Sequence, residues 1–100
     1  MKMNLSKMSA KAYLVPLTKR DFERGCMFTT RNDKTKQFYL VAPNVGIPYI
    51  VNDYNKQVYA HIESVQDEYF LSTNSFFGKK VNLTIKFSEC FRIIYNDSNI

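Results

Sequence analysis

One stretch of the chain places residue types suited to proton transfer at a regular spacing. Tyr59, His61 and Glu63 stand two residues apart in QVYAHIE (57–63), and residues two apart lie on the same face of a β-strand. An imidazole oriented by a carboxylate is what a general base requires. The same alternation is typical of an exposed strand face that carries ordinary polar side chains. Because this is the only histidine in the sequence, we favour that reading and expect no catalytic residue and no enzyme.

The two cysteines are the remaining candidate nucleophiles. Neither Cys26 nor Cys90 has a histidine beside it in the sequence, and neither follows a glycine-rich elbow. One histidine and two distant cysteines provide too few ligands for a metal site, and three scattered glycines form no phosphate-binding loop. We therefore expect free thiols that do no chemistry, no metal and no cofactor. Whether the two cysteines lie close together is left open.

The clearest of the elements that must position these residues is KVNLTIKFS (80–88), where apolar and polar residues alternate strictly. A period of two predicts a strand with one face on the core and the other in solvent. The segment 57–63 alternates in the same way. Residues expected to share the core are Val58, Ala60, Ile62, Val81, Leu83, Ile85 and Phe87. Residues expected in solvent are Lys80, Asn82, Thr84 and Lys86.

Further short strands are expected along the whole chain. They are 12–17, 26–30, 37–42, 49–51, 68–72 and 90–95, the last with a short helix as the alternative. A helix is expected over 18–25, where Thr18 can cap the first turn and Gly25 suits its end. Phe22 should hold this helix against the sheet. Pro16 cannot donate a ladder hydrogen bond and so favours an edge position for the first strand.

These elements predict one all-β domain over 11–96, between a flexible arm at 1–10 and a tail at 97–100. We expect about seven short antiparallel strands in a small barrel, roll or sandwich, with one short α-helix near the N-terminus. No apolar run approaches the length of a membrane-spanning helix, and the first residues lack the apolar core of a signal peptide. A cytoplasmic protein is the expectation that follows.

Positive charge is concentrated in the first third of the sequence. Up to Lys36 there are nine Lys or Arg residues against three acidic ones, whereas the remainder has five against six. Such asymmetry favours an anionic partner surface, although lysine-rich ends are also often merely solvated. The residues expected to contact the partner are Lys19, Arg20, Arg24, Arg31, Lys34 and Lys36. Reversing the charge of Arg20 and Arg24 is expected to weaken binding more than reversing Lys79 and Lys80.

Aromatic residues interleaved with lysines provide a second signal. β-Rich proteins that bind single-stranded nucleic acid stack bases on such rings. The stacking candidates are Tyr39 and Tyr59, with Tyr49, Tyr54 and Tyr69 as further members of the set. The lysines near them in sequence are Lys34, Lys36, Lys56, Lys79 and Lys80. A small β-domain also needs aromatic residues for its core, so this signal alone does not decide the function.

Three classes of function remain. The leading hypothesis is a non-catalytic binding protein that occupies a macromolecular partner, with a protein partner favoured over nucleic acid alone. The small size and the Lys-, Asn-, Tyr- and Ile-rich composition are typical of proteins that phages and mobile elements use to inhibit a host machine, such as a nucleic-acid-handling complex. The alternative is direct binding of RNA or single-stranded DNA, and the third is a small nuclease or hydrolase. The sequence does not indicate an oligomeric state.

Overall fold

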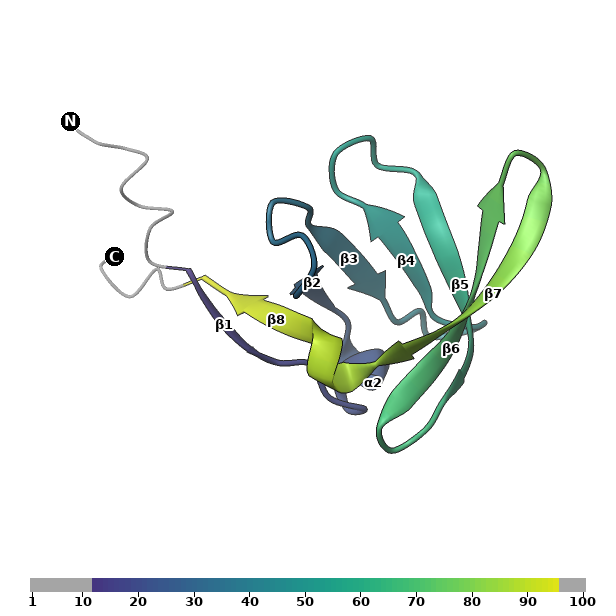
Figure 1. Ribbon diagram of the computed structural model, residues 1–100. Coiled ribbons are helices and arrows are strands. Elements are labelled where there is room, and N and C mark those ends of the chain that lie inside the picture. Colours follow the sequence, from purple (N-terminus) through teal and green to yellow (C-terminus); the bar gives the residue numbers. More distant parts are fainter. Residues whose placement is uncertain (1–11, 96–100) are drawn as a thin grey trace.

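The computed structural model describes residues 12–95 and arranges them as one antiparallel sheet with a short helix against it (Figure 1). The elements are β1 (Tyr13–Pro16), α2 (Asp21–Arg24), β2 (Cys26–Thr30), β3 (Phe38–Val41), β4 (Tyr49–Asn52), β5 (Val58–Val65), β6 (Tyr69–Phe76), β7 (Lys79–Lys86), a 3-10 turn η1 (Phe87–Glu89) and β8 (Cys90–Ile94). The strand order is β1-β8-β2-β3-β4-β5-β6-β7. The expected arm at 1–10 and tail at 97–100 lie outside the described residues.

The sheet is a meander from β2 to β7, and β8 returns to lie between β2 and β1. It curls into a half-barrel, visible in Figure 1 as the bend from β8 round to β7. The predicted all-β class, with one short helix near the N-terminus, is therefore confirmed, with eight strands in place of about seven. Segment 90–95 forms a strand rather than the alternative helix. Pro16 lies in an edge strand, as the missing N–H requires.

The core occupies the concave face of the half-barrel. Phe28, Thr30, Phe38, Ile50, Tyr59, Phe70, Ile85 and Cys90 line one small cavity of about 80 Å³ there. Strands from both halves of the sheet contribute to this cavity, so their shared face is the inner one. Helix α2 seals the curl, because its Phe22 ring contacts the rings of Phe70 and Phe87 at centroid distances of 4.9 and 5.8 Å. The expectation that Phe22 holds the helix to the sheet agrees with these contacts.

The helix is shorter than the sequence predicts, since it covers only Asp21–Arg24, and the Thr18 hydroxyl caps none of its N–H groups. The Asp21 carboxylate nevertheless accepts hydrogen bonds from the Thr18 backbone N–H at 2.8 Å, as in one half of a capping box, and from the Thr18 hydroxyl at 3.2 Å. Gly25 follows the last turn with a φ of +81°, and a Cβ there would lie 2.7 Å from the Leu40 carbonyl oxygen. Glycine is therefore required at this position by both backbone angle and space.

Strand β7 shows the predicted alternation, but only half of its burial. Lys80, Asn82, Thr84 and Lys86 are exposed, whereas Val81, Leu83 and Ile85 are only partly buried. The reason is that β7 is an edge strand, paired with β6 alone. Phe87 is fully part of the core, but it belongs to η1.

A bulge in β5 overturns one part of the predicted core. Ile50 pairs with Ala60, whereas the next residue, Val51, pairs with Val58, so Tyr59 is the extra residue on β5. The pattern before the bulge is therefore shifted by one position. Val58 is 53% exposed, so its predicted burial is wrong, while Ala60 and Ile62 are buried as expected.

The segment predicted as a connection at 73–80 is mostly strand. β6 continues to Phe76 and pairs along its whole length with β7, from Tyr69 opposite Lys86 to Phe76 opposite Lys79. Pairing with a neighbour overrides the weak strand propensity of Asn and Ser here. The result is a long hairpin with a two-residue turn at 77–78.

Candidate binding surface at the turn rim

The structure separates the six basic residues that the sequence grouped together. Lys19, Arg20 and Arg24 lie on and before α2, at the start of β2, whereas Arg31, Lys34 and Lys36 follow the end of that strand. Five strand residues span roughly 17 Å, so Arg24 and Arg31 lie at opposite ends of β2, although Arg31 also contacts η1, whose Phe87 packs on Phe22 of the helix. The helix does pack at the base of the β2–β3 hairpin, through Gly25 and Leu40, but the basic turn lies at the other end.

The helix group has acidic neighbours that balance its charge. Lys19 forms an ion pair with Asp67 of the β5–β6 turn at 3.3 Å, and Glu23 lies on the helix itself. Glu68 follows Asp67 in the same turn. With Lys86, which pairs with Tyr69 beside this turn, and Asp21 of the helix, four cations and four carboxylates lie at this end, so their net charge is zero.

The opposite end of the sheet gathers three basic turns that are far apart in the sequence. In a meander, alternate turns lie at the same end, and Figure 1 shows the β2–β3, β4–β5 and β6–β7 turns together along one edge of the half-barrel. We call residues 31–37, 53–57 and 76–80 the turn rim. Its cations are Arg31, Lys34, Lys36, Lys56, Lys79 and Lys80, and its carboxylates are Asp33 and Asp53. The rim therefore carries a net charge of +4.

Both carboxylates of the rim are occupied by local partners. Asp33 accepts hydrogen bonds from the hydroxyl and the backbone N–H of Thr35, and these bonds lower the pKa of Asp33. Asp53 accepts a hydrogen bond from the Lys56 ammonium at 2.7 Å, and this bond raises the pKa of Lys56. Lys36 contributes in addition to the lowered pKa of Asp33, and among residues 12–95 Lys56 is the rim cation that forms an ion pair.

Three rim cations lie over aromatic rings on the outer face of the sheet. The Arg31 guanidinium and the Lys34 ammonium lie 5.3 and 5.7 Å from the centroid of the Phe91 ring, and Lys56 lies 5.5 Å from that of Tyr39. These distances fall within the range of cation–π attraction. Arg31 also donates to the Ser88 carbonyl oxygen at 2.9 Å. Cationic groups are thereby held on the sheet in defined positions.

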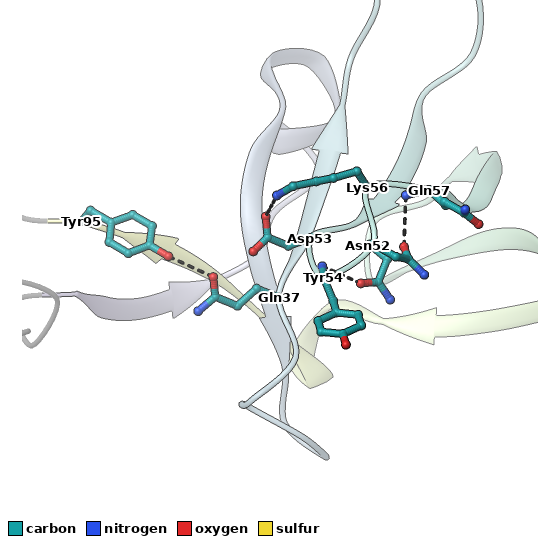
Figure 2. A network of polar contacts seen from close by, with 8 residues as sticks. Gln37, Asn52, Asp53, Tyr54, Lys56, Gln57 and Tyr95 are labelled. Atoms are coloured by element: carbon teal, nitrogen blue, oxygen red, sulfur yellow. Dashed lines mark hydrogen bonds and ion pairs between the residues drawn. The ribbon is translucent and has the colours of Figure 1, made fainter.

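Polar contacts, one buried and one exposed, hold the β2–β3 turn in place. Thr29 is 1% exposed, and its hydroxyl donates to the Lys36 carbonyl oxygen at 2.7 Å. The Gln37 side chain accepts a hydrogen bond from the Tyr95 hydroxyl at 3.1 Å (Figure 2). The turn is consequently tied both to its own hairpin and to the end of β8.

Asparagine side chains shape the β4–β5 turn, which forms one wall of an open cleft. Asn52 Oδ1 accepts from the Tyr54 backbone N–H at 2.8 Å, and Asn55 Oδ1 accepts from that of Gln57 at 3.1 Å. Such bonds are typical of Asx turns. Figure 2 shows that Tyr54 joins this network through its backbone only, and its side chain is almost wholly exposed. The cleft measures about 600 Å³ and is lined by Thr35, Lys36, Gln37, Asn52, Asp53 and Tyr54.

The two tyrosines expected to stack with bases lie on different faces. Tyr39 is on the outer face, partly covered by Lys56. The bulge turns Tyr59 inward, where its ring contacts that of buried Phe38 at 5.1 Å. Tyr59 is thus separated from the outer aromatic residues and belongs to the edge of the core.

Of the residues considered for chemistry, Tyr59, His61 and Glu63 line one open cleft of about 440 Å³. The bulge, however, turns the Tyr59 ring toward Phe38 and away from a row with the other two. Glu63 accepts a hydrogen bond from the Thr73 hydroxyl at 2.7 Å, while the His61 ring faces that of Tyr49 at 6.2 Å. Within residues 12–95, no group of three or more His, Cys, Asp or Glu side chains could hold a metal ion.

The comparisons with known proteins assign no function to this surface. No protein-family model matches the sequence, and neither a curated protein nor a solved structure shows significant similarity to it. None of the helices among the described residues is long and apolar enough to span a membrane.

Proposed function

We propose that this protein is a non-catalytic binding protein that uses the turn rim to occupy an anionic surface of a macromolecular partner. The observation that carries the proposal is the collection of six cations on three turns, with a net charge of +4, at one end of a rigid sheet. A local excess of one sign accelerates encounter with an oppositely charged partner and contributes to specificity. A nucleic-acid-handling complex of a host cell has anionic surfaces, and we propose that this protein inhibits such a complex.

The proposed location is the cytoplasm. Cys90 pairs with Thr30 at one end of β2, while Cys26 lies four residues away along that strand, roughly 13 Å. A disulfide requires Cα atoms within about 7 Å of each other, so the two thiols cannot form a bond within one chain. Free thiols suit a reducing compartment.

The experiment compares two variants that change the net charge equally at the two ends of the sheet. Immobilised wild-type protein, Lys79→Glu/Lys80→Glu and Arg20→Glu/Arg24→Glu are each incubated with an extract of the native host, with and without nuclease treatment. We expect the Lys79/Lys80 variant to retain on the order of tenfold less partner at low salt, because it reverses part of the rim field. The Arg20/Arg24 variant should bind nearly as the wild type does, since its end of the sheet is already balanced.

The opposite ranking would place the contact at α2, as the charge distribution in the sequence alone suggested. Equal retention by all three proteins would show that the rim is a solvated surface. A partner that survives nuclease treatment is a protein, and one that is lost with the nucleic acid is bound through it or is the nucleic acid itself.

A further inference from the structure

The turn at the tip of the β6–β7 hairpin places a bulky residue in a backbone conformation that such residues disfavour. The paired residues Phe76 and Lys79 enclose a two-residue turn in which both residues have positive φ, +52° at Phe77 and +80° at Gly78. Two-residue turns of this kind favour Asn or Asp followed by Gly. A bulky aromatic residue is uncommon in the left-handed region and is strained there. Phe77 therefore occupies a position where Asn would suit the fold better.

The Phe77 side chain gives no packing in return for this strain. Its relative exposure is 105%, and that of the neighbouring Phe76 is 42%. A fully exposed phenyl ring on a strained backbone position contributes nothing to the folded state of the free protein. Strained residues that persist are often part of a functional site, so the contact that uses this ring is with another molecule.

The surroundings of the ring point to the chemistry of that molecule. Lys79 and Lys80 follow the tip directly, and both are exposed. On the neighbouring turn, Tyr54 is 94% exposed and stands two residues from Lys56. On the third turn, Arg31 and Lys34 lie over Phe91. Two of the three rim turns thus carry an exposed aromatic ring beside cations, and the third holds its cations over Phe91 of β8.

We propose that the partner of the rim is single-stranded nucleic acid, and that Phe77 stacks on an unpaired base. This inference rests on the proposed function and names the partner of the same surface. The repeating unit of a single strand is a phosphate and a base with an open π face. Proteins bind it by combining cations along the backbone with aromatic stacking platforms. An acidic protein would need the cations, but it would not call for exposed aromatic rings at the tips of two neighbouring turns.

The experiment measures fluorescence anisotropy of a labelled single-stranded oligonucleotide of mixed sequence, roughly 12–16 nucleotides long, as DNA and as RNA. The proteins are the wild type, Phe77→Asn and Val45→Asn. Val45 is the matched control, since it is an exposed apolar residue (90%) in the β3–β4 connection at the opposite end of the sheet. Thermal unfolding of all three proteins is recorded in the same buffer.

We expect Phe77→Asn to weaken binding of the single strand by about 5- to 150-fold, the range for loss of one stacked base. The same change should leave the unfolding temperature equal or higher, because Asn suits the turn. Val45→Asn should bind as the wild type does. A duplex of the same sequence should bind more weakly than the single strand, since its bases are not free to stack.

Two results would overturn the inference. Equal affinity of Phe77→Asn and wild-type protein for the single strand would mean that the ring does not stack. Failure of the wild type to bind either oligonucleotide at low salt would exclude nucleic acid as the partner. In that case the proposed function would still stand if a nuclease-resistant partner bound the wild type and was lost in Lys79→Glu/Lys80→Glu.

Discussion

The two thiols show how burial decides the chemistry of a single residue. Desolvation raises the pKa of Cys26 to about 12, with a further contribution from the nearby Asp21 carboxylate. Burial likewise raises the pKa of Cys90 to about 11, with a smaller effect of Glu89. Because a thiolate is the reactive form, a raised pKa disfavours nucleophilic attack by either side chain at neutral pH. That neither cysteine is a nucleophile stays a prediction.

The raised pKa of Cys90 makes a prediction about stability at alkaline pH. Above the ordinary value of 9.0 the unfolded chain loses the thiol proton, whereas the folded protein keeps it up to about pH 11. The stabilisation that this thiol contributes is therefore fully present below pH 9 and is lost progressively as the pH rises from 9 to about 11. Denaturant unfolding at neutral pH and at about pH 10 measures the loss. We expect a smaller loss in Cys90→Val, which keeps a buried apolar side chain but cannot titrate.

Other titrating groups are common to both proteins and cancel in this comparison. Parallel losses in wild type and Cys90→Val would contradict the assignment of a raised pKa to this thiol.

Residue-level expectations succeeded where a side chain depends on its own segment. The roles of Phe22 and Gly25 follow from local helix signals and agree with the structure. Tyr59 and Val58 could not be assigned, because their directions depend on a one-residue register shift against β4. Such a bulge is set by packing between paired strands, and the sequence alone does not show which strands pair or in what register.

At the scale of elements, β7 predicts a sharp difference between neighbouring residues. Ile85 packs against the core from the inner face, whereas Thr84 is exposed on the outer face. We expect Ile85→Ala to lower the free energy of unfolding by about 2 kcal/mol, at the low end of the range for core residues because β7 is an edge strand. Thr84→Ala should lower it by less than about 1 kcal/mol. Equilibrium denaturation with urea measures both changes.

Comparable losses at the two positions would mean that β7 is buried on both faces, for example in an oligomer. A negligible loss at both would mean that this edge of the sheet opens before the molecule unfolds.

The elements themselves were largely predictable, but their ends and their arrangement were less so. Alternation located β7 and most of β5, because one face of each strand must meet the core. The outer half of β6 was missed, since Thr73 to Ser75 carry no apolar alternation and become strand only by pairing with β7. A useful signal was nevertheless present. In a meander, the first, third and fifth turns must lie at one end, so the grouping of Lys34, Lys56 and Lys80 follows from strand order alone.

At the scale of the whole molecule, the first and last described strands depend on each other. β1 pairs with β8 over four residue pairs, from Tyr13 opposite Ile94 to Pro16 opposite Phe91. Such contacts span almost the whole described chain, and closing them is costly in chain entropy. Within residues 12–95, β8 has a second partner in β2, whereas β1 pairs with β8 alone. The sheet therefore holds β8 firmly and β1 at its edge.

This arrangement predicts that β1 opens independently of the rest of the sheet. Three of its four residues are exposed, and its anchor is the buried Leu17, whose N–H donates to the Cys90 carbonyl oxygen at 3.1 Å. Strands with few buried contacts exchange their amide hydrogens through local opening, while central strands require global unfolding. We expect peptides covering 12–17 to exchange much faster than those covering 49–52 or 90–94 in hydrogen exchange measured by mass spectrometry. The longer edge strand β7, with eight residue pairs and three partly buried apolar side chains, should fall between these limits. Exchange of 12–17 as slow as that of 49–52 would show that β1 and the central strands form one cooperative unit, and that the edge of this sheet is covered.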